Sequence, residues 1–255
     1  MTMTMINVAS IEPLAHREAM RLQAQELERT LSLLRSLDDT GWTATTDCPA
    51  WDVRAMYQHV LGACEAGASM RENVHQLRLA RTDRKRHGGP LEAALSSQQV
   101  RERADLGPTD IVERLTAVAS KTVRGRTRTP RLLRNHAKLA IGGPVHETWK
   151  LGYLIDTIYL RDMWMHRVDA SLAVGQPVQL SADHDGRIVA DVVAEWARRH
   201  GSSFMLELSG PADGTYAYQP QSATAEHVAL DAVAFCRTLA GRIPASGLLA
   251  TVVPF

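Results

Sequence analysis

Asp162 and His166 stand four residues apart in the apolar stretch YLRDMWMHRVDA, residues 159–170. Residues at that spacing lie one above the other on one face of an α-helix, so both side chains can reach a single point. Ile155 and Ile158 precede them on the same face, which indicates that the face is buried. A buried carboxylate needs a compensating charge, and a bound cation is one way to supply it. The pair is therefore a candidate for two ligands of one metal ion.

His59 is the candidate for a third ligand, on a separate predicted helix that starts at Asp52. Gly62 and Ala63 make that part of the helix small and apolar, which would leave room for a metal and a substrate. Two imidazoles and a carboxylate suit zinc, and could also take nickel, iron or manganese. Three protein ligands leave a coordination position open to water or substrate, which is typical of catalytic rather than structural sites.

A simpler interpretation needs no metal. A histidine on an apolar helix face commonly forms a hydrogen bond within the core, and an Asp and a His at this spacing commonly bond to each other. Spacing alone favours this hydrogen-bonded pair over a metal site. The sequence HETWK, residues 146–150, begins like the zinc metalloprotease motif, but Lys150 stands where that motif has its second histidine.

Other groups that could carry chemistry give weaker signals. There is no Gly-x-Ser-x-Gly nucleophile motif. Cys48 lies just before the helix that starts at Asp52, where the helix N-terminus could stabilise a thiolate, but packing is the favoured interpretation. Trp51 beside it is expected to anchor the core or a hinge.

The composition is that of a globular protein. Of 255 residues, 45% are hydrophobic and 22% are charged, and the formal net charge is +1. A charge so close to zero argues against a general nucleic-acid binder. The most basic cluster, LARTDRKRH at residues 79–87, is predicted to be a solvated loop.

The three cysteines are too few and too scattered for a disulfide framework or a zinc ribbon. The N-terminal residues do not have the pattern of a signal peptide, and no apolar stretch is long enough to span a bilayer. We therefore expect a soluble, cytoplasmic protein without a membrane partner.

The elements that would position these residues are mainly α-helical. Apolar residues at helical spacing predict four long helices, at about residues 12–37, 52–77, from 108 onwards, and 147–173. Four amphipathic helices with connections of mixed length favour a four-helix bundle. The candidate ligands would then come from its second and fourth helices.

The pattern changes after residue 175. A helix is predicted at 181–201, a β-hairpin at 204–220, a short helix at 230–241, and a closing strand at 247–255. The sequence thus predicts two domains, a bundle at residues 1–175 and a small α+β domain at residues 176–255.

Beyond these patterns, the chain resembles a known family. The segment LSLLRSLDDTGWTATTDCPAWDVRAMYQHVLGACE and the later DMWMHRVD are similar to the mycothiol-dependent maleylpyruvate isomerase family. That family belongs to the DinB-like superfamily of metal-binding four-helix bundles. The C-terminal LELSGPADG and DAVAFCRTLAGR resemble the small sterol-carrier-like domain that follows the bundle in this family.

The resemblance implies that His59, Asp162 and His166 hold a divalent ion, usually zinc. The best-known isomerases of the family carry Glu where this chain has Asp162, a departure that bears more on the exact activity than on the metal. The family also implies an arginine that faces the bundle cavity from the C-terminal domain. Arg237 and Arg242 are the two candidates, and a surface arginine at a helix end is an equally good interpretation of either.

The activity implied is metal-assisted thiol chemistry, with mycothiol as the low-molecular-weight thiol and a small electrophile as substrate. The product would be an isomer in an isomerase or a thiol adduct in an S-transferase. Two alternatives stay open at this point: a metal-dependent hydrolase on the same bundle, and a non-catalytic metal-binding or sensing protein. The sequence does not predict the oligomeric state.

Overall fold

The computed structural model describes residues 5–143, 145–219, 221–222 and 224–255. They form two compact units, Ala15–Val178 and Gln179–Phe255, the second of which also includes the N-terminal residues up to Leu14. The domain boundary near residue 175 stays a prediction, because compact units defined by contacts do not test independent folding. Among the described residues, no helix has both the length and the apolar character needed to cross a membrane.

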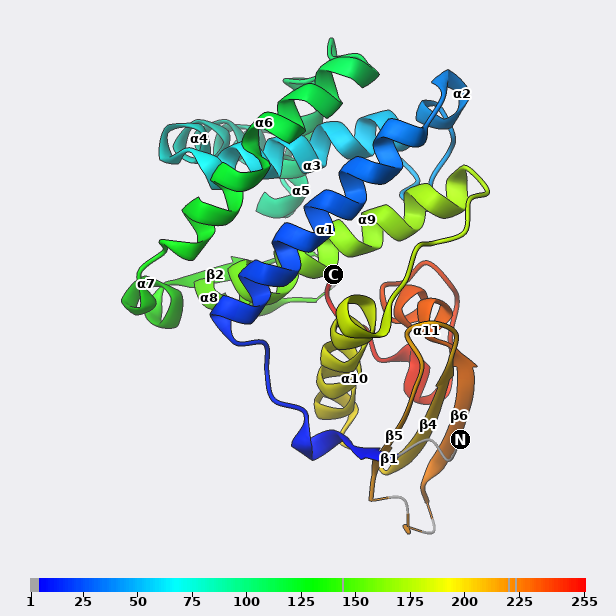
Figure 1. Cartoon of the computed structure of the whole chain (residues 1–255). Helices are drawn as coiled ribbons and strands as arrows, with labels where there is room; N and C mark the ends of the chain where they lie inside the picture. Colours follow the sequence, from blue (N-terminus) through cyan, green and yellow to red (C-terminus); the bar gives the residue numbers. More distant parts are fainter. Residues whose placement is uncertain (1–4, 144, 220, 223) are drawn as a thin grey trace. The chain divides into compact units, whose positions relative to one another are not determined.

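Four helices of the first unit form the expected bundle (Figure 1). They are α1 (His16–Ser36), α3 (Val53–Ala68), α6 (Pro108–Thr127) and α9 (Tyr159–Ala173). Within the bundle, α1 contacts α6 and α9, and α3 contacts the same two helices. Their apolar faces share a core that includes Leu27, Tyr57 and Met163. The mainly α fold with a four-helix bundle is thus confirmed.

Two contacts fix how these helices pack. Between α1 and α9, the Arg167 guanidinium donates to both carboxylate oxygens of Glu26, at 2.5 and 3.1 Å, and both side chains are buried. Between α3 and α6, the backbones approach so closely that a Cβ on Gly125 would lie 2.1 Å from the Gly67 carbonyl oxygen. A bidentate ion pair and a glycine contact therefore set the spacing on the two sides of the core.

The predicted second helix is in fact two helices. Asp52 caps α3, where its side chain accepts from the Ala55 amide at 2.7 Å. Ser69 has extended backbone angles and caps α4 (Met70–His87), so it ends one helix and begins the next. The basic segment predicted as a loop is the last part of α4. That prediction was wrong because cationic residues favour a helix C-terminus, and Gly88, at φ 76°, supplies the stop.

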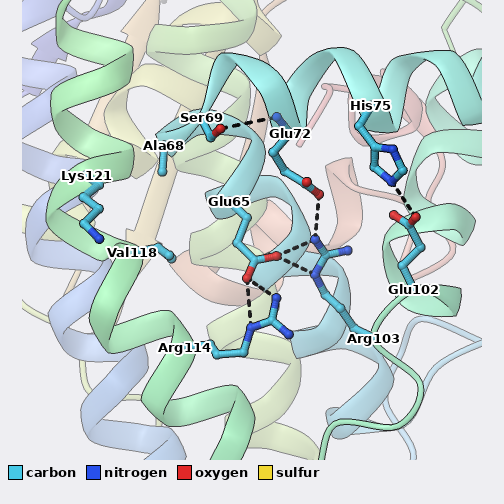
Figure 2. Close-up of a pocket in the computed structure, with 10 residues that line it drawn as sticks. All are labelled: Glu65, Ala68, Ser69, Glu72, His75, Glu102, Arg103, Arg114, Val118 and Lys121. Atoms are coloured by element: carbon cyan, nitrogen blue, oxygen red, sulfur yellow. Dashed lines mark hydrogen bonds and ion pairs between the residues drawn. The ribbon is translucent and has the colours of Figure 1, made fainter.

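Helix α5 (Leu91–Arg101) was not predicted at all. It packs against both α3 and α4. The three are joined by ion pairs in which Arg103, just after α5, bonds to Glu65 of α3 and Glu72 of α4 (Figure 2). These contacts hold the two inserted helices against the bundle.

The connection to the fourth helix also differs from the prediction. After α7 (Arg131–His136), β2 (Lys138–Ile141) and β3 (Glu147–Lys150) form an antiparallel pair. The helix begins only at Leu151, as α8 (Leu151–Tyr153), and continues through a π-helical turn, η2 (Leu154–Ile158), into α9. Residues 147–150 alternate between partly buried and exposed, which suits a strand better than a helix. The remaining short helix of this unit is α2 (Asp39–Trp42).

The second unit combines one sheet with two main helices. The sheet has the order β1-β5-β4-β6, with β1 (Met5–Asn7), β4 (Phe204–Ser209), β5 (Gly214–Tyr218) and β6 (Glu226–Asp231). The helices are α10 (Arg187–His200) and α11 (Ala232–Leu239), with short helical turns η1 (Val8–Ser10), η3 (Ala182–Gly186) and η4 (Gly247–Ala250). Trp196 of α10 packs edge-on against Phe204 and Phe235 in the centre of its core.

The α+β character and the hairpin β4–β5 were predicted correctly, but the closing strand was not. Residues 247–250 form a 3₁₀ turn that starts at Gly247, which has a φ of 59°, and no strand follows in the described residues up to 255. The sheet instead gains β6, paired in parallel with β4, and β1 from the start of the chain.

Candidate metal centre

The structure brings His59, Asp162 and His166 together between α3 and α9. One donor atom from each lies within 4.8 Å of the others. The Nε2 atoms of His59 and His166 lie 3.7 and 3.3 Å from the two different carboxylate oxygens of Asp162. Both Nε2 atoms therefore face the carboxylate, and the two rings contact each other edge to face, with centroids 5.5 Å apart.

The ring of His59 is held from two sides. Its Nδ1 lies 2.8 Å from Oε1 of Gln99 on α5, and this hydrogen bond turns Nε2 towards Asp162. Trp51 stacks on the ring with centroids 5.0 Å apart and an interplanar angle of 26°. The tryptophan predicted to be a core or hinge anchor thus also restricts one candidate ligand.

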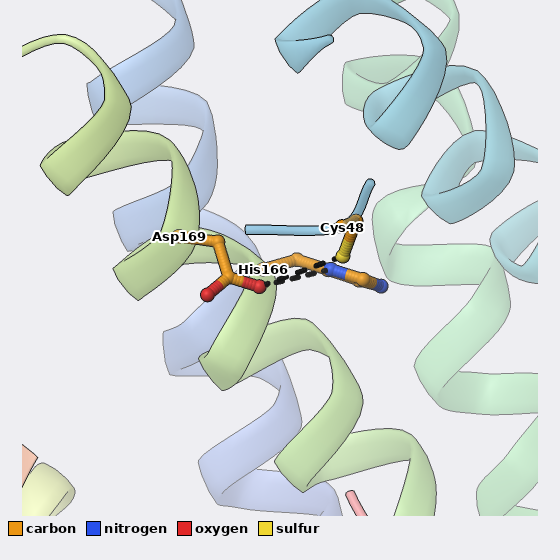
Figure 3. Close-up of side chains that lie close together, drawn as sticks. All are labelled: Cys48, His166 and Asp169. Atoms are coloured by element: carbon orange, nitrogen blue, oxygen red, sulfur yellow. Dashed lines mark hydrogen bonds and ion pairs between the residues drawn. The ribbon is translucent and has the colours of Figure 1, made fainter. Parts of the chain in front are cut away.

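The ring of His166 has polar neighbours at its other nitrogen (Figure 3). Its Nδ1 lies 3.9 Å from Oδ2 of Asp169, which is too long for a direct hydrogen bond. The Cys48 thiol donates to that same carboxylate oxygen at 3.7 Å. Cys48 packs against the core as expected, and with His166 and Asp169 it forms a second group of closely spaced donors.

The charges within the candidate site are strongly coupled. Burial alone would raise the pKa of Asp162, but the charge of His166 and its hydrogen bond to the carboxylate, with a smaller contribution from the nearby His59, hold that pKa well below its usual value. Burial alone would lower the pKa of His166, but the Asp162 carboxylate outweighs it and raises the pKa well above 6.5. Without another cation, a proton on His166 therefore supplies the positive charge that balances Asp162.

The donor set fits the divalent metal that the resemblance implies. Two imidazole nitrogens and one carboxylate are ligands that zinc accepts, and both histidines have a polar group near their second nitrogen, as metal-bound histidines usually do. The Asp162 side chain keeps 26% of its surface exposed, whereas those of His59 and His166 keep 11% and 7%. Solvent or a substrate can thus approach on the carboxylate side.

Arg237 and Arg242 lie in the second unit. Arg237 is on α11, and Arg242 follows that helix, where its guanidinium donates to the Ala240 carbonyl oxygen at 3.3 Å. Both side chains are half-buried. The proposed position of one of them beside a bundle cavity stays a prediction.

Sequence reasoning missed Gln99, which is buried and contacts a candidate ligand. Its helix, α5, was not predicted, so its buried face was not predicted either. A signal was present: in LEAALSSQQV, Gln99 falls eight residues after Leu91 on the face that also contains Leu95. A glutamine that continues an apolar stripe needs a buried partner.

A comparison with protein families identifies the bundle. The model of the mycothiol maleylpyruvate isomerase N-terminal domain matches residues 23–171. The chain belongs to this family. The matched region contains all three candidate ligands together with Gln99.

Solved structures agree with the assigned fold. The chain is similar to the mycothiol-dependent maleylpyruvate isomerase, at 16% identity and a TM-score of 0.56, with 94% of this chain and 93% of that chain covered. A histidine-to-alanine mutant of that isomerase matches over the same extents at 15% identity and the same TM-score. At these identities the likeness shows the fold. No curated protein sequence gives a significant match.

Proposed function

We propose that this protein is a divalent-metal-dependent enzyme that uses a low-molecular-weight thiol to act on a small electrophile. Mycothiol is the proposed thiol, zinc the proposed metal, and the reaction is either isomerisation or S-transfer. The observation that carries the proposal is the convergence of His59, Asp162 and His166 within the region that matches the family model.

The three candidate ligands would hold the metal through two neutral nitrogens and one anionic oxygen. A bound divalent cation would lower the pKa of a coordinated thiol, so that thiolate is available near neutral pH. With only one carboxylate in the set, the site would keep a net positive charge that favours an anionic thiol or substrate. Trp51 would shield one side of His59 from water.

The thiolate would add to a conjugated cis double bond and form a carbon–sulfur bond. In an isomerase, rotation about the resulting single bond and loss of the same thiolate would give the trans product. In an S-transferase, the carbanion formed by addition would take up a proton and the adduct would leave. We propose that Arg237 or Arg242 binds the anionic group of the substrate.

Metal content tests the site. We expect about one equivalent of zinc per chain in the purified protein, and less than roughly a tenth of that in His59→Ala and Asp162→Ala, because each variant removes one of three ligands. His75→Ala is a matched control, since His75 is half-exposed and pairs with Glu102 away from the site. Equal metal content in all four proteins would contradict the site assignment.

Product analysis tests the reaction. The zinc-loaded protein is incubated with a panel of electrophiles, with and without mycothiol, and the products are identified by mass spectrometry. We expect isomers or adducts only when the thiol is present. Turnover without thiol would support a hydrolase instead, and absence of any product across the panel would support a metal-binding protein without catalytic activity.

A further inference from the structure

A line of buried amide side chains connects His59 to Glu72. At its far end, Nε2 of Gln76 donates to the Gly62 carbonyl oxygen at 3.0 Å and to Oε1 of Glu72 at 2.8 Å. A backbone carbonyl and a carboxylate can only accept hydrogen bonds. The amide of Gln76 must therefore present its nitrogen to them and its oxygen to the opposite side.

That orientation passes along the line one residue at a time. Oε1 of Gln76 accepts from Nε2 of Gln99 at 2.9 Å. Gln99 then has only its oxygen left to face Nδ1 of His59, 2.8 Å away. Since an amide oxygen cannot donate, the hydrogen of this last bond must belong to the histidine. In the neutral ring, Nδ1 carries the proton and Nε2 carries the lone pair.

The surroundings leave the amides little freedom to turn. Gln76 and Gln99 are 1% and 3% exposed, so a reversed amide would lose bonds that water could not replace. The Arg103 guanidinium donates to the backbone oxygen of Gln99 at 3.0 Å. A Cβ on Gly62 would lie 2.7 Å from both Cβ and Cγ of Gln99. The space beside Gly62, which was predicted to hold a metal, is therefore filled by the side chain of Gln99.

The far end of the line reaches the surface. Glu72 lines an open cavity of about 530 Å³, together with Glu65, Arg103 and Lys121 (Figure 2). None of the three candidate ligands is among the described residues that line this cavity. There Glu72 also pairs with Arg103, which keeps its carboxylate in place as the acceptor that starts the line.

We propose that Gln99, oriented by Gln76, is a positioning residue that fixes His59 in the tautomer with its hydrogen on Nδ1. This tautomer presents the Nε2 lone pair to the candidate metal position beside Asp162. In the opposite tautomer, Nε2 would donate to Asp162 and could not bind a metal. The value of this arrangement for metal binding rests on the proposed function, whereas the tautomer itself does not.

The test is ¹⁵N NMR of the histidine side chains in the metal-free protein at about pH 8.5, where ordinary imidazoles are neutral. The His59 signals are identified by their loss in His59→Ala. We expect wild-type His59 to show a protonated Nδ1 and an unprotonated Nε2. In Gln99→Met, which keeps the bulk but removes the acceptor, we expect Nε2 to become protonated, because Asp162 is then its nearest acceptor. Gln98→Met is the matched control and should keep the wild-type signals.

Zinc affinity, measured by competition with a chelator, gives a second readout. We expect Gln99→Met to weaken binding roughly 10- to 100-fold, and Gln98→Met to leave it unchanged. Should Gln99→Met not fold, Gln76→Met tests the same line one step further away, with the same expected change of tautomer. A protonated Nε2 in the wild type, or an unchanged tautomer in the folded variant, would overturn the proposal. If the expected tautomers are observed but the protein does not bind zinc, the proposed function is contradicted and the proposal about the tautomer still holds.

Discussion

At the scale of single residues, the candidate site is a competition between a proton and a metal ion. His166 shares its proton with Asp162 when no other cation is present, because the carboxylate raises the pKa of the imidazole well above 6.5. A metal can use Nε2 of His166 only after that proton has left. The same carboxylate that attracts a metal therefore also makes protons a stronger competitor.

This competition predicts how zinc affinity depends on pH. Since the pKa of His166 is raised, zinc affinity should fall as pH decreases through that raised value, by up to about tenfold per pH unit. The fall should begin well above pH 6.5, where an isolated histidine would still be neutral. Chelator competition between about pH 6 and 9 measures it.

Asp162→Asn separates the two effects of the carboxylate. The variant should bind zinc more weakly at high pH, because it lacks the anionic ligand. Its remaining affinity should start to fall only at lower pH, because His166 no longer has the carboxylate that raises its pKa. An unchanged pH profile in this variant would show that His166 does not supply the competing proton.

The residue scale also shows what the sequence could predict of the site. His59, Asp162 and His166 were found from their types, the helical spacing and the family resemblance, and the structure brings them together. The stripe that Gln99 shares with Leu91 and Leu95 could have indicated a buried glutamine, but its contact with His59 depends on how α5 packs beside α3, which no local pattern predicts. The residues that hydrogen-bond to a metal-binding side chain are set by packing between helices, and the spacing of residues within one helix does not predict that packing.

At the scale of elements, the bundle depends on two contacts that tolerate little change. The first is the close approach of α3 and α6 at Gly67 and Gly125. We expect Gly125→Ala to destabilise the bundle by about 3 kcal/mol, at the upper end for overpacking, because its Cβ would meet a backbone oxygen that cannot move away. Gly142→Ala is the control, since its nearest neighbour would lie at 3.6 Å. Urea unfolding of both variants measures the difference.

The second contact is the buried ion pair between Glu26 of α1 and Arg167 of α9. We expect Glu26→Ala to cost about 3–5 kcal/mol, because it leaves a buried guanidinium without its carboxylate. The double variant Glu26→Leu with Arg167→Met should lose less than Glu26→Ala, since it removes both charges. Glu28→Ala, at an exposed position of the same helix, should have almost no effect. A double variant less stable than Glu26→Ala would contradict this explanation.

The elements also show where sequence patterns fail. The four bundle helices were predicted because each has a long apolar stripe. The break at Ser69 was missed because a single serine in a helical pattern is usually tolerated, and only its role as an N-cap shows that it ends one helix and begins another. Strand β6 was missed because its partner β4 lies about twenty residues earlier, across a parallel pairing that no turn signal marks.

At the scale of the whole molecule, the chain has two compact units, and only one contains the candidate metal centre. A ligand that binds the folded state stabilises it, by about 2.7 kcal/mol at a concentration of 100 times its Kd. We therefore expect saturating zinc to raise the unfolding midpoint of the bundle unit by roughly 5–10 °C. A separate transition of the second unit should not move.

Calorimetry with and without zinc tests this prediction. His59→Ala should abolish the shift, and His75→Ala should keep it. If both transitions moved together, the two units would unfold as one cooperative body, and the predicted domain boundary near residue 175 would fail.

The amide line behind His59 has a consequence for where protons can travel. Proton wires are built from groups that both accept and release protons, such as water, hydroxyls and imidazoles. Carboxamides hold their hydrogens, so Gln99 and Gln76 orient the ring without conducting charge from it. Protons therefore cannot leave through the amide line behind His59, and Asp162, whose side chain is the most solvent-exposed of the three candidate ligands, offers a route to solvent.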